Sequence, residues 1–243
     1  MKKVKITVQQ ILEILKNLRI IVLADNDGTI RNTNSVKDAC LDAFCEKEFG
    51  SIPDSFPTLP TDIHRRMHGR PMNEIFVAIA AEIYGKSISL DEGQEITLRL
   101  NEYIRPEYVG RKAYEGAKEF YSALKAMGIP MYILTGMEDD LVREGLEKNG
   151  MGGIFEEILG APRTKEENIQ YVLKKHPGCR ILAMGDAMAE YRATMAIPGT
   201  IFLAFDFENR EARGKRVFPK EVNVLTSYGQ EVWDEIEKQL ELQ

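Results

Sequence analysis

Apolar and polar positions follow two different patterns along the chain, and together these patterns predict an α/β fold. Short uninterrupted apolar runs are typical of strands that are buried on both faces of a parallel sheet. Four such runs lie at residues 20–24, 129–134, 180–184 and 200–205. Segments with apolar residues at steps of three and four, typical of helices packed on a core, lie at residues 117–127, 139–148 and 165–175. This alternation predicts a doubly wound parallel sheet covered by helices on both faces.

One stretch interrupts the alternation. Between the first and second apolar runs, the chain shows helical periodicity at residues 36–49, 72–84 and 90–108 and no convincing strand. Prolines at positions 53, 57 and 60 predict a loop between the first two of these helices. We therefore expect an inserted all-α cap domain at residues 33–112, within a core domain formed by residues 20–32 and 113–243.

The first nineteen residues predict an amphipathic helix that precedes the core. Val8, Ile11, Leu12, Leu15 and Leu18 recur at helical steps with polar residues between them. We expect this apolar face to pack against the body of the protein. A contact between two copies of the chain is the alternative, so both a monomer and a homodimer remain open.

Composition narrows the class of protein. The chain has 243 residues, of which 44% are hydrophobic and 29% charged, and its net charge is −6. This is the composition of a globular domain, and the acidic balance disfavours binding to nucleic acids or anionic membranes. No apolar stretch approaches the length of a membrane span, and no signal peptide is expected. Three cysteines without a CxxC pair indicate reduced thiols and a cytoplasmic protein.

Chemically reactive residues follow the predicted strands at the points where they end. In open α/β sheets, functional side chains gather beyond the carboxyl ends of the strands. The residues at these ends, together with one lysine near a helix start, are Asp25, Asp27, Thr135, Gly136, Lys165, Asp186 and Glu190. Each alone is typical of a turn or a solvated side chain, but their order and placement together predict one shared site.

These residue types favour phosphoryl chemistry. Closely spaced carboxylates repel one another and need a cation between them. An oxygen-only ligand set without His or Cys favours Mg²⁺. A lysine and a hydroxyl supply the charge and hydrogen-bond donors that a phosphoryl group needs. One carboxylate can attack phosphorus, and a second carboxylate two residues further on can transfer protons to the leaving oxygen.

The chain resembles the haloacid dehalogenase (HAD) superfamily through four motifs. Residues 23–30, which read Leu-Ala-Asp-Asn-Asp-Gly-Thr-Ile, resemble its first motif, and residues 132–135 its second. Lys165 is similar to the third motif and residues 183–190 to the fourth. The helical insert resembles the cap of the phosphoglycolate phosphatase and β-phosphoglucomutase branch. The resemblance covers about residues 20–206 and implies a Rossmann-like core.

The resemblance also implies roles for the residues that match. Asp25 would be the nucleophile and a Mg²⁺ ligand, and Asp27 the general acid and base with its backbone carbonyl on the metal. Asp186 would ligate Mg²⁺, and Glu190 would do so directly or through water. The residues implied to contact the phosphate are Asn26, Thr135, Gly136 and Lys165.

Three positions depart from the family pattern. Glu190 stands where the family usually has Asp, and its longer arm can still reach the metal through a water molecule. Gly136 replaces a frequent Asn and loses a side-chain donor, and Ala187 replaces a frequent Ser. None of these changes removes a group that the reaction requires.

The insert carries the best candidate for substrate choice. Residues 65–71 concentrate three arginines and a histidine in an acidic protein, and Arg70 follows a glycine at a predicted helix start. We predict that Arg70 binds the anionic substrate. A solvated basic turn is the alternative interpretation.

The predicted function is Mg²⁺-dependent hydrolysis of a small phosphomonoester, a phosphorylated metabolite, through an aspartyl-phosphate intermediate. A phosphosugar mutase resembling β-phosphoglucomutase and a non-catalytic phospho-ligand-binding protein on the same fold remain alternatives. A dehalogenase is disfavoured, because its reaction has no leaving oxygen for Asp27 to protonate. The chain has no GxxxxGK[ST], GxGxxG, HExxH or GxSxG motif, which argues against ATP-dependent transfer, nicotinamide chemistry and serine hydrolysis.

Overall fold

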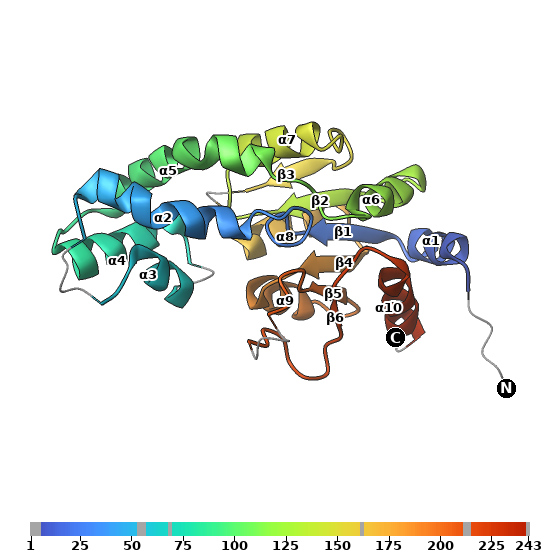
Figure 1. Cartoon of the computed structure of the whole chain (residues 1–243). Coiled ribbons are helices and arrows are strands. Elements are labelled where there is room, and N and C mark those ends of the chain that lie inside the picture. Colours follow the sequence, from blue (N-terminus) through green and yellow to red (C-terminus); the bar gives the residue numbers. More distant parts are fainter. Residues whose placement is uncertain (1–5, 53–56, 68–69, 161–162, 211–214, 242–243) are drawn as a thin grey trace. The chain divides into compact units, whose positions relative to one another are not determined.

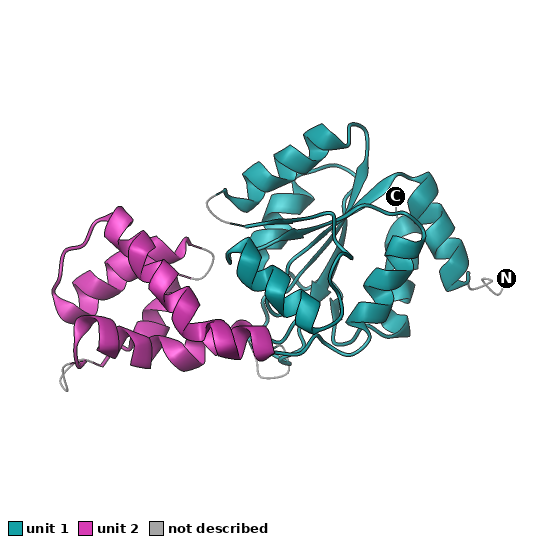
Figure 2. Ribbon diagram, turned by 90° about the horizontal axis from the view of Figure 1, so that it is seen from above, with its two compact units in different colours: residues 1–32, 111–243 teal, residues 33–110 magenta. Residues whose placement is uncertain are grey.

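The computed structural model describes residues 6–52, 57–67, 70–160, 163–210 and 215–241. The chain divides into two compact units, which Figure 2 shows in different colours. Residues 1–32 and 111–243 form the first unit, and residues 33–110 form the second. Residues 111 and 112, which the periodicity had grouped with the helical insert, therefore belong to the first unit.

The first unit is built on a parallel sheet whose order along the sheet is β3-β2-β1-β4-β5-β6 (Figure 1). Its strands are β1 (Ile20–Ala24), β2 (Met131–Leu134), β3 (Glu157–Leu159), β4 (Arg180–Gly185), β5 (Ile201–Phe205) and β6 (Val224–Leu225). β1 pairs with β2 on one side and with β4 on the other, so that Ala24 lies beside both Ile133 and Met184. The first motif therefore leaves the sheet from a central strand.

Burial explains why four of the strands could be predicted. All five residues of β1 and of β5 are buried, as expected of strands covered on both faces. β2 begins at Met131, two residues later than predicted, since Pro130 lacks an N–H and only its carbonyl joins the sheet, accepting from Val22 at 2.9 Å. β3 and β6 were not predicted because runs of three and two residues are too short to show a period.

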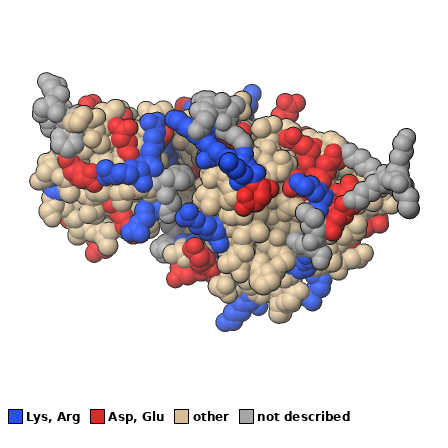
Figure 3. Space-filling model, turned by 90° about the horizontal axis from the view of Figure 1, so that it is seen from below, with Lys and Arg blue, Asp and Glu red and all other residues tan. Residues whose placement is uncertain are grey.

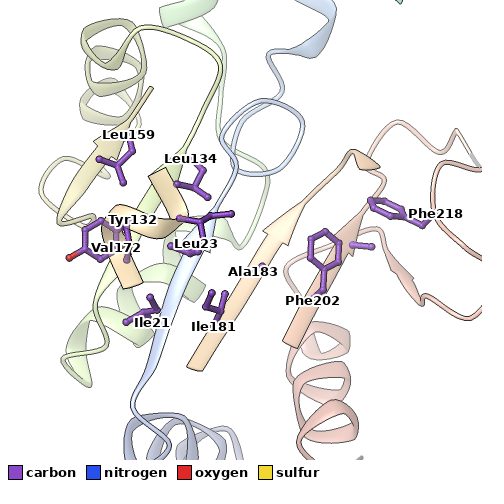
Figure 4. Close-up of a cluster of buried hydrophobic side chains, with 12 residues drawn as sticks. Ile21, Leu23, Tyr132, Leu134, Leu159, Val172, Ile181, Ala183, Phe202 and Phe218 are labelled. Carbon is purple, nitrogen blue, oxygen red and sulfur yellow. The ribbon is translucent and has the colours of Figure 1, made fainter. Parts of the chain in front are cut away.

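Helices cover both faces of the sheet. They are α1 (Val8–Asn17), α6 (Ala117–Ala126), α7 (Asp139–Lys148), α8 (Lys165–Lys175), α9 (Met188–Met195) and α10 (Gln230–Glu241). One face is packed by α8 and α9, and Ile21, Leu23 and Val172 belong to one buried cluster there (Figure 4). Ile169 of α8 is part of the same cluster. The apolar face of α1 packs against α10 and β1. The predicted α/β class with an inserted all-α unit is confirmed.

Within the described residues of the second unit, all regular elements are helices, and the unit has its own core. It contains α2 (Asn34–Phe49), α3 (Pro60–Arg66), α4 (Met72–Tyr84) and α5 (Leu90–Gly110). Phe44 and Phe76 form part of this core, with ring centroids 5.9 Å apart. The helix α3 replaces the end of the predicted loop, because Pro60 occupies the first helical turn, where a proline is tolerated.

The two points where the chain leaves and re-enters the first unit are neighbours. The Asn32 N–H donates to the carbonyl of Lys112 at 3.2 Å, and Arg31 forms an antiparallel bridge with Ala113. The two segments that connect the inserted unit to the first unit therefore run side by side. No helix within the described ranges is both long and apolar enough to cross a membrane.

Candidate active site

The carboxyl ends of three strands bring predicted residues of the first unit together. Asp25 directly follows β1, Thr135 follows β2, and Asp186 follows β4. The Asp25 N–H donates to the carbonyl of Met184, the last but one residue of β4, at 2.9 Å. Because β1 and β4 are neighbours in register, the first and fourth motifs leave the sheet side by side.

The loop after β1 is held by its own hydrogen bonds. The Asn26 carbonyl accepts from the N–H groups of Ile30 and Arg31, each at 3.0 Å. Gly28 adopts a φ of 75°, a left-handed conformation that glycine takes without strain. This tight turn fixes Asp25 and Asp27 at the end of the strand.

The Asn26 side chain has a structural role in this loop. It is fully buried, its Nδ2 donates to Asp27 Oδ1 at 2.7 Å, and its Oδ1 accepts from Arg31 Nε at 3.2 Å. Sequence reasoning had assigned Asn26 to the phosphate. The structure directs its side chain to Asp27 and Arg31 instead, so a phosphate contact by Asn26 stays a prediction.

Lys165 joins the third motif to the first and the fourth. Its Nζ donates to Asp25 Oδ1 at 2.9 Å and also forms an ion pair with Glu190. Lys165 is the first residue of α8, which begins with a capping box in which Thr164 accepts from the Glu167 N–H and Glu167 accepts from the Thr164 N–H. The cap fixes the first turn of α8 and with it the start of the lysine side chain.

Because Asp25 and Lys165 are buried together, the pKa of each depends strongly on the charge of the other. Asp25 is only 5% exposed. Burial raises the pKa of its carboxyl well above the usual value; Lys165 opposes that rise, and the carboxylates of Glu190, Asp186 and Asp27 add to it. Burial alone would lower the pKa of Lys165, but the charges of Asp25 and Glu190 outweigh it and raise that pKa.

Glu190 enters the site because Gly185 has no side chain. Glu190 lies in the first turn of α9 and is 7% exposed. A Cβ added at Gly185 would lie 2.7 Å from Glu190 Cβ, which is closer than side-chain atoms approach. Glu190 Oε2 is buried and has no hydrogen-bond partner among the described residues. A buried acceptor in this state favours a ligand or ion next to it.

A second cation, Arg210, lies beside the fourth motif. Its Nη2 lies 3.2 Å from Asp186 Oδ2 and donates to the Asp186 carbonyl at 2.8 Å, while its Nε donates to Asp206 Oδ1 at 2.9 Å. Sequence reasoning missed Arg210 and Asp206. Asp206 directly follows β5, so the strand-end rule that identified Asp25 would have found it; no comparable signal marks Arg210.

Thr135 and Gly136 differ in their surroundings. Thr135 is buried, and its Oγ1 accepts from the Met137 N–H at 3.0 Å, which leaves the hydroxyl proton to donate. Gly136 is exposed, and an added Cβ would meet no atom within 4 Å. A ligand can therefore approach the Gly136 backbone closely.

Arg70 belongs to the second unit, where the structure pairs it with an acid. Its side chain is 64% exposed, and its Nη2 lies 2.5 Å from Glu74 Oε2. It precedes α4, which begins at Met72 after an N-cap at Pro71, so it does not open the helix as predicted. These are the surroundings of a solvated ion pair; His68 and Gly69 lie outside the described residues.

The residues of the first unit fit a divalent cation, although they do not already form a ligand cage. Within the described ranges, no three His, Cys, Asp or Glu side chains form a group that could hold a metal ion. The reason is that Asp25 and Glu190 face Lys165 while Asp186 faces Arg210. The donors are nevertheless all oxygens, carboxylates outnumber cations, and Glu190 Oε2 lacks a partner among the described side chains. This chemistry suits Mg²⁺.

Comparisons with solved structures show the same fold at low sequence identity. A HAD hydrolase of family IA, variant 3, from Entamoeba histolytica superimposes with a TM-score of 0.70 at 16% identity, over 91% of this chain and 99% of that one. The magnesium-bound HAD-hydrolase YfnB from Bacillus subtilis gives 0.62 at 16% identity, over 89% and 98%. A predicted phosphoglycolate phosphatase from Haemophilus somnus gives 0.59 at 21% identity, over 76% and 84%.

Sequence comparison identifies the family. No curated protein matches the chain. The family model of haloacid dehalogenase-like hydrolases matches residues 21–197, a range that contains all four motifs and their strand ends. The resemblance inferred from the motifs is confirmed, and the chain belongs to the haloacid dehalogenase-like hydrolases.

Proposed function

We propose that this hydrolase is a Mg²⁺-dependent phosphatase that cleaves a small phosphomonoester through an aspartyl-phosphate intermediate. The observation that carries the proposal is the buried contact of Lys165 Nζ with Asp25 Oδ1 at 2.9 Å, with Asp27 two residues further along the same loop. A cation held on one buried carboxylate, beside a second and more accessible carboxylate, suits nucleophilic attack followed by proton transfer.

The proposed reaction has two steps at phosphorus. In the first, an oxygen of Asp25 attacks phosphorus, the bond from phosphorus to the ester oxygen breaks, and the Asp27 carboxyl protonates the leaving oxygen. In the second, water attacks phosphorus and gives a proton to the Asp27 carboxylate. The bond from phosphorus to Asp25 then breaks, and inorganic phosphate is released.

Neighbouring residues would orient the phosphoryl group. Lys165 would offset the charge of Asp25 and of the phosphoryl oxygens, and the Thr135 hydroxyl and the Gly136 N–H would donate to those oxygens. Asp25, Asp186 and the Asp27 carbonyl would hold Mg²⁺, and Glu190 would do so directly or through a water molecule. When bound, Mg²⁺ would supply positive charge that favours the ionised form of the carboxylates and of the phosphate.

The fold relatives support the substrate class and the metal. One solved structure with this fold is a predicted phosphoglycolate phosphatase, and another is bound to magnesium. We propose a small phosphorylated metabolite as the substrate, with residues 33–110 acting as the cap and Arg70 as a candidate contact for a second anionic group. Cys40, Cys45 and Cys179 form no disulfide, which supports our proposal that the protein acts in the reducing cytoplasm.

The test compares two matched Asp→Asn variants with the wild type. Release of inorganic phosphate from p-nitrophenyl phosphate with Mg²⁺ should fall roughly a thousandfold or more in Asp25→Asn, because an amide oxygen is a poor nucleophile. Asp91→Asn, on the exposed first turn of α5 in the second unit, should keep the wild-type rate.

Trapping of the intermediate provides the second measurement. Rapid acid quench of a ³²P-labelled ester should leave alkali-labile label on the wild-type chain and none on Asp25→Asn. An Asp25→Asn variant that turns over at the wild-type rate, or a wild-type chain that never carries label, would refute the mechanism.

A further inference from the structure

Arg210 contacts the proposed metal ligand more extensively than a surface ion pair would. Its guanidinium reaches both the carboxylate and the backbone carbonyl of Asp186, and it also binds Asp206. Asp186 and Asp206 are 6% and 5% exposed, and the Arg210 side chain is 21% exposed. The contact is therefore built into the site and only weakly screened by water.

The chain after β5 places Arg210 at this point. Asp206 directly follows β5. Its N–H donates to the Leu225 carbonyl at 2.9 Å, and its own carbonyl accepts from the Asn209 N–H at 3.1 Å. Asn209 adopts a φ of 57°, a conformation that Asn tolerates better than most residues. This turn brings Arg210 back over the strand end that carries Asp206 and towards the end of β4.

The two cations of the site hold different carboxylates. Lys165 bridges Asp25 and Glu190, whereas Arg210 bridges Asp186 and Asp206. A guanidinium stays charged at any physiological pH, so it occupies the Asp186 carboxylate whenever no other cation does. Mg²⁺ would have to share or displace this contact and would bind next to a fixed positive charge.

We propose that Arg210 is a positioning residue that holds Asp186 in the metal-free protein and lowers the affinity of the site for Mg²⁺. This inference rests on the proposed function, because it takes Asp186 to be a metal ligand. In the metal-bound protein, Arg210 remains anchored by Asp206 and by the Asp186 carbonyl while the Asp186 carboxylate turns to the cation. Because Arg210 competes for the Asp186 carboxylate, a higher Mg²⁺ concentration is needed to fill the site.

The test measures Mg²⁺ binding by isothermal titration calorimetry without substrate. Arg210→Gln removes the charge but keeps an amide donor for the Asp186 carbonyl, and it should lower the dissociation constant about tenfold. Arg210→Lys keeps the charge and should stay within about twofold of the wild type.

Arg180→Gln is the matched control, because Arg180 lies at the opposite end of β4 and, among the described residues, its guanidinium donates to the Gly199 carbonyl. It changes the net charge by the same amount and should leave Mg²⁺ binding unchanged. Urea unfolding of all variants checks that each one remains folded under the conditions of the titration.

The outcomes separate this inference from the proposed function. If Arg210→Gln binds Mg²⁺ no more tightly than the wild type, the proposed competition is wrong. It is also wrong if Arg180→Gln gains as much Mg²⁺ affinity as Arg210→Gln. Asp186→Asn should bind Mg²⁺ at least tenfold more weakly. If Asp186→Asn binds Mg²⁺ like the wild type, the metal site itself is wrong, whatever the arginine variants show.

Discussion

Buried charges in the site are tolerated because each carboxylate has a neighbour of opposite charge. Lys165 forms ion pairs with Asp25 and Glu190, and Arg210 forms one with Asp186. Removing one partner of such a pair leaves an uncompensated charge away from water, which is strongly destabilising. The site also depends on small residues that leave room for these contacts, as Gly185 does for Glu190.

Gly185→Ala should damage the site without adding or removing any charge. The added methyl group would overlap the Glu190 side chain, whose Cβ and Cγ lie 2.7 and 2.8 Å from it. Glu190 would have to shift away from Lys165, and we expect phosphatase turnover to fall about tenfold to a hundredfold. Steady-state kinetics with p-nitrophenyl phosphate measures this loss.

Gly110→Ala provides the control for that substitution. A methyl group there meets no atom within 4 Å, so turnover should stay at the wild-type level. Full activity of Gly185→Ala would show that the position of Glu190 has no influence on the reaction.

The sequence named Asp25, Asp186 and Lys165 as members of this site, but it named neither Arg210 nor Asp206. Asp25 and Asp186 follow long buried strands, so the general rule for strand ends identified them. Arg210 sits in a turn beyond β5, and its choice of Asp186 and Asp206 depends on how that turn folds back. No local pattern encodes such a contact, because it joins elements that are distant in sequence.

At the scale of elements, pairs of charged side chains also tie helices to one another. In the second unit, Asp38 of α2 accepts from Arg65 Nε of α3 at 3.0 Å and lies 3.0 Å from His64 Nδ1. Burial acts to raise the pKa of Asp38, but hydrogen bonds from His64 and Arg65 outweigh it and lower that pKa. Asp38 thus stabilises the packing of α3 only while it is ionised.

Asp38→Asn should change the pH dependence of stability in a defined direction. Because the folded pKa lies below the ordinary 3.8, the carboxylate stabilises the fold above that pH, and this contribution disappears as the pH falls through the folded value. We expect the variant to lose about 1 kcal/mol or less near neutral pH, since water screens the half-exposed pair. Urea unfolding at several values from about pH 6 to about pH 3 should show that the difference in the free energy of unfolding between wild type and Asp38→Asn becomes smaller as the pH falls.

Asp91→Asn again serves as the comparison. Its carboxyl is exposed in the first turn of α5, so we expect no comparable narrowing. A difference between wild type and Asp38→Asn that stays constant down to the lowest pH would contradict the assignment.

Element boundaries were predicted where local signals are strong. α4 begins and ends where the periodicity placed it, at Met72 and Tyr84, and the Thr164–Glu167 capping box fits the predicted start near Lys165. α3 was missed because three prolines masked a helix that starts at Pro60. The edge strands β3 and β6 were missed because their pairing with β2 and β5 defines them more than their own residues do.

At the scale of the whole molecule, the insertion leaves the first unit with adjacent ends. The bond from the Asn32 N–H to the Lys112 carbonyl closes this junction. On the face drawn in Figure 3, Lys and Arg side chains lie among Asp and Glu side chains. Each unit has its own hydrophobic core, which favours independent folding of the first unit.

Deletion of residues 33–110, with a short Gly-Ser linker joining Asn32 to Arg111, should leave a folded first unit. We expect cooperative urea unfolding with a smaller m-value than that of the whole chain, since less surface becomes exposed. Circular dichroism should show that helix and strand content persist. Gradual unfolding with strong binding of a hydrophobic dye would mean that the sheet needs the inserted helices.

The central position of β1 also has a consequence for synthesis. β1 is made first, but its partner β4 begins at residue 180, about 160 residues later. At roughly 5–20 residues per second, one edge of this apolar strand waits on the order of ten to thirty seconds for its neighbour. The nascent chain therefore spends that interval with an open strand edge, and ribosome-associated chaperones have the greatest opportunity to act on it then.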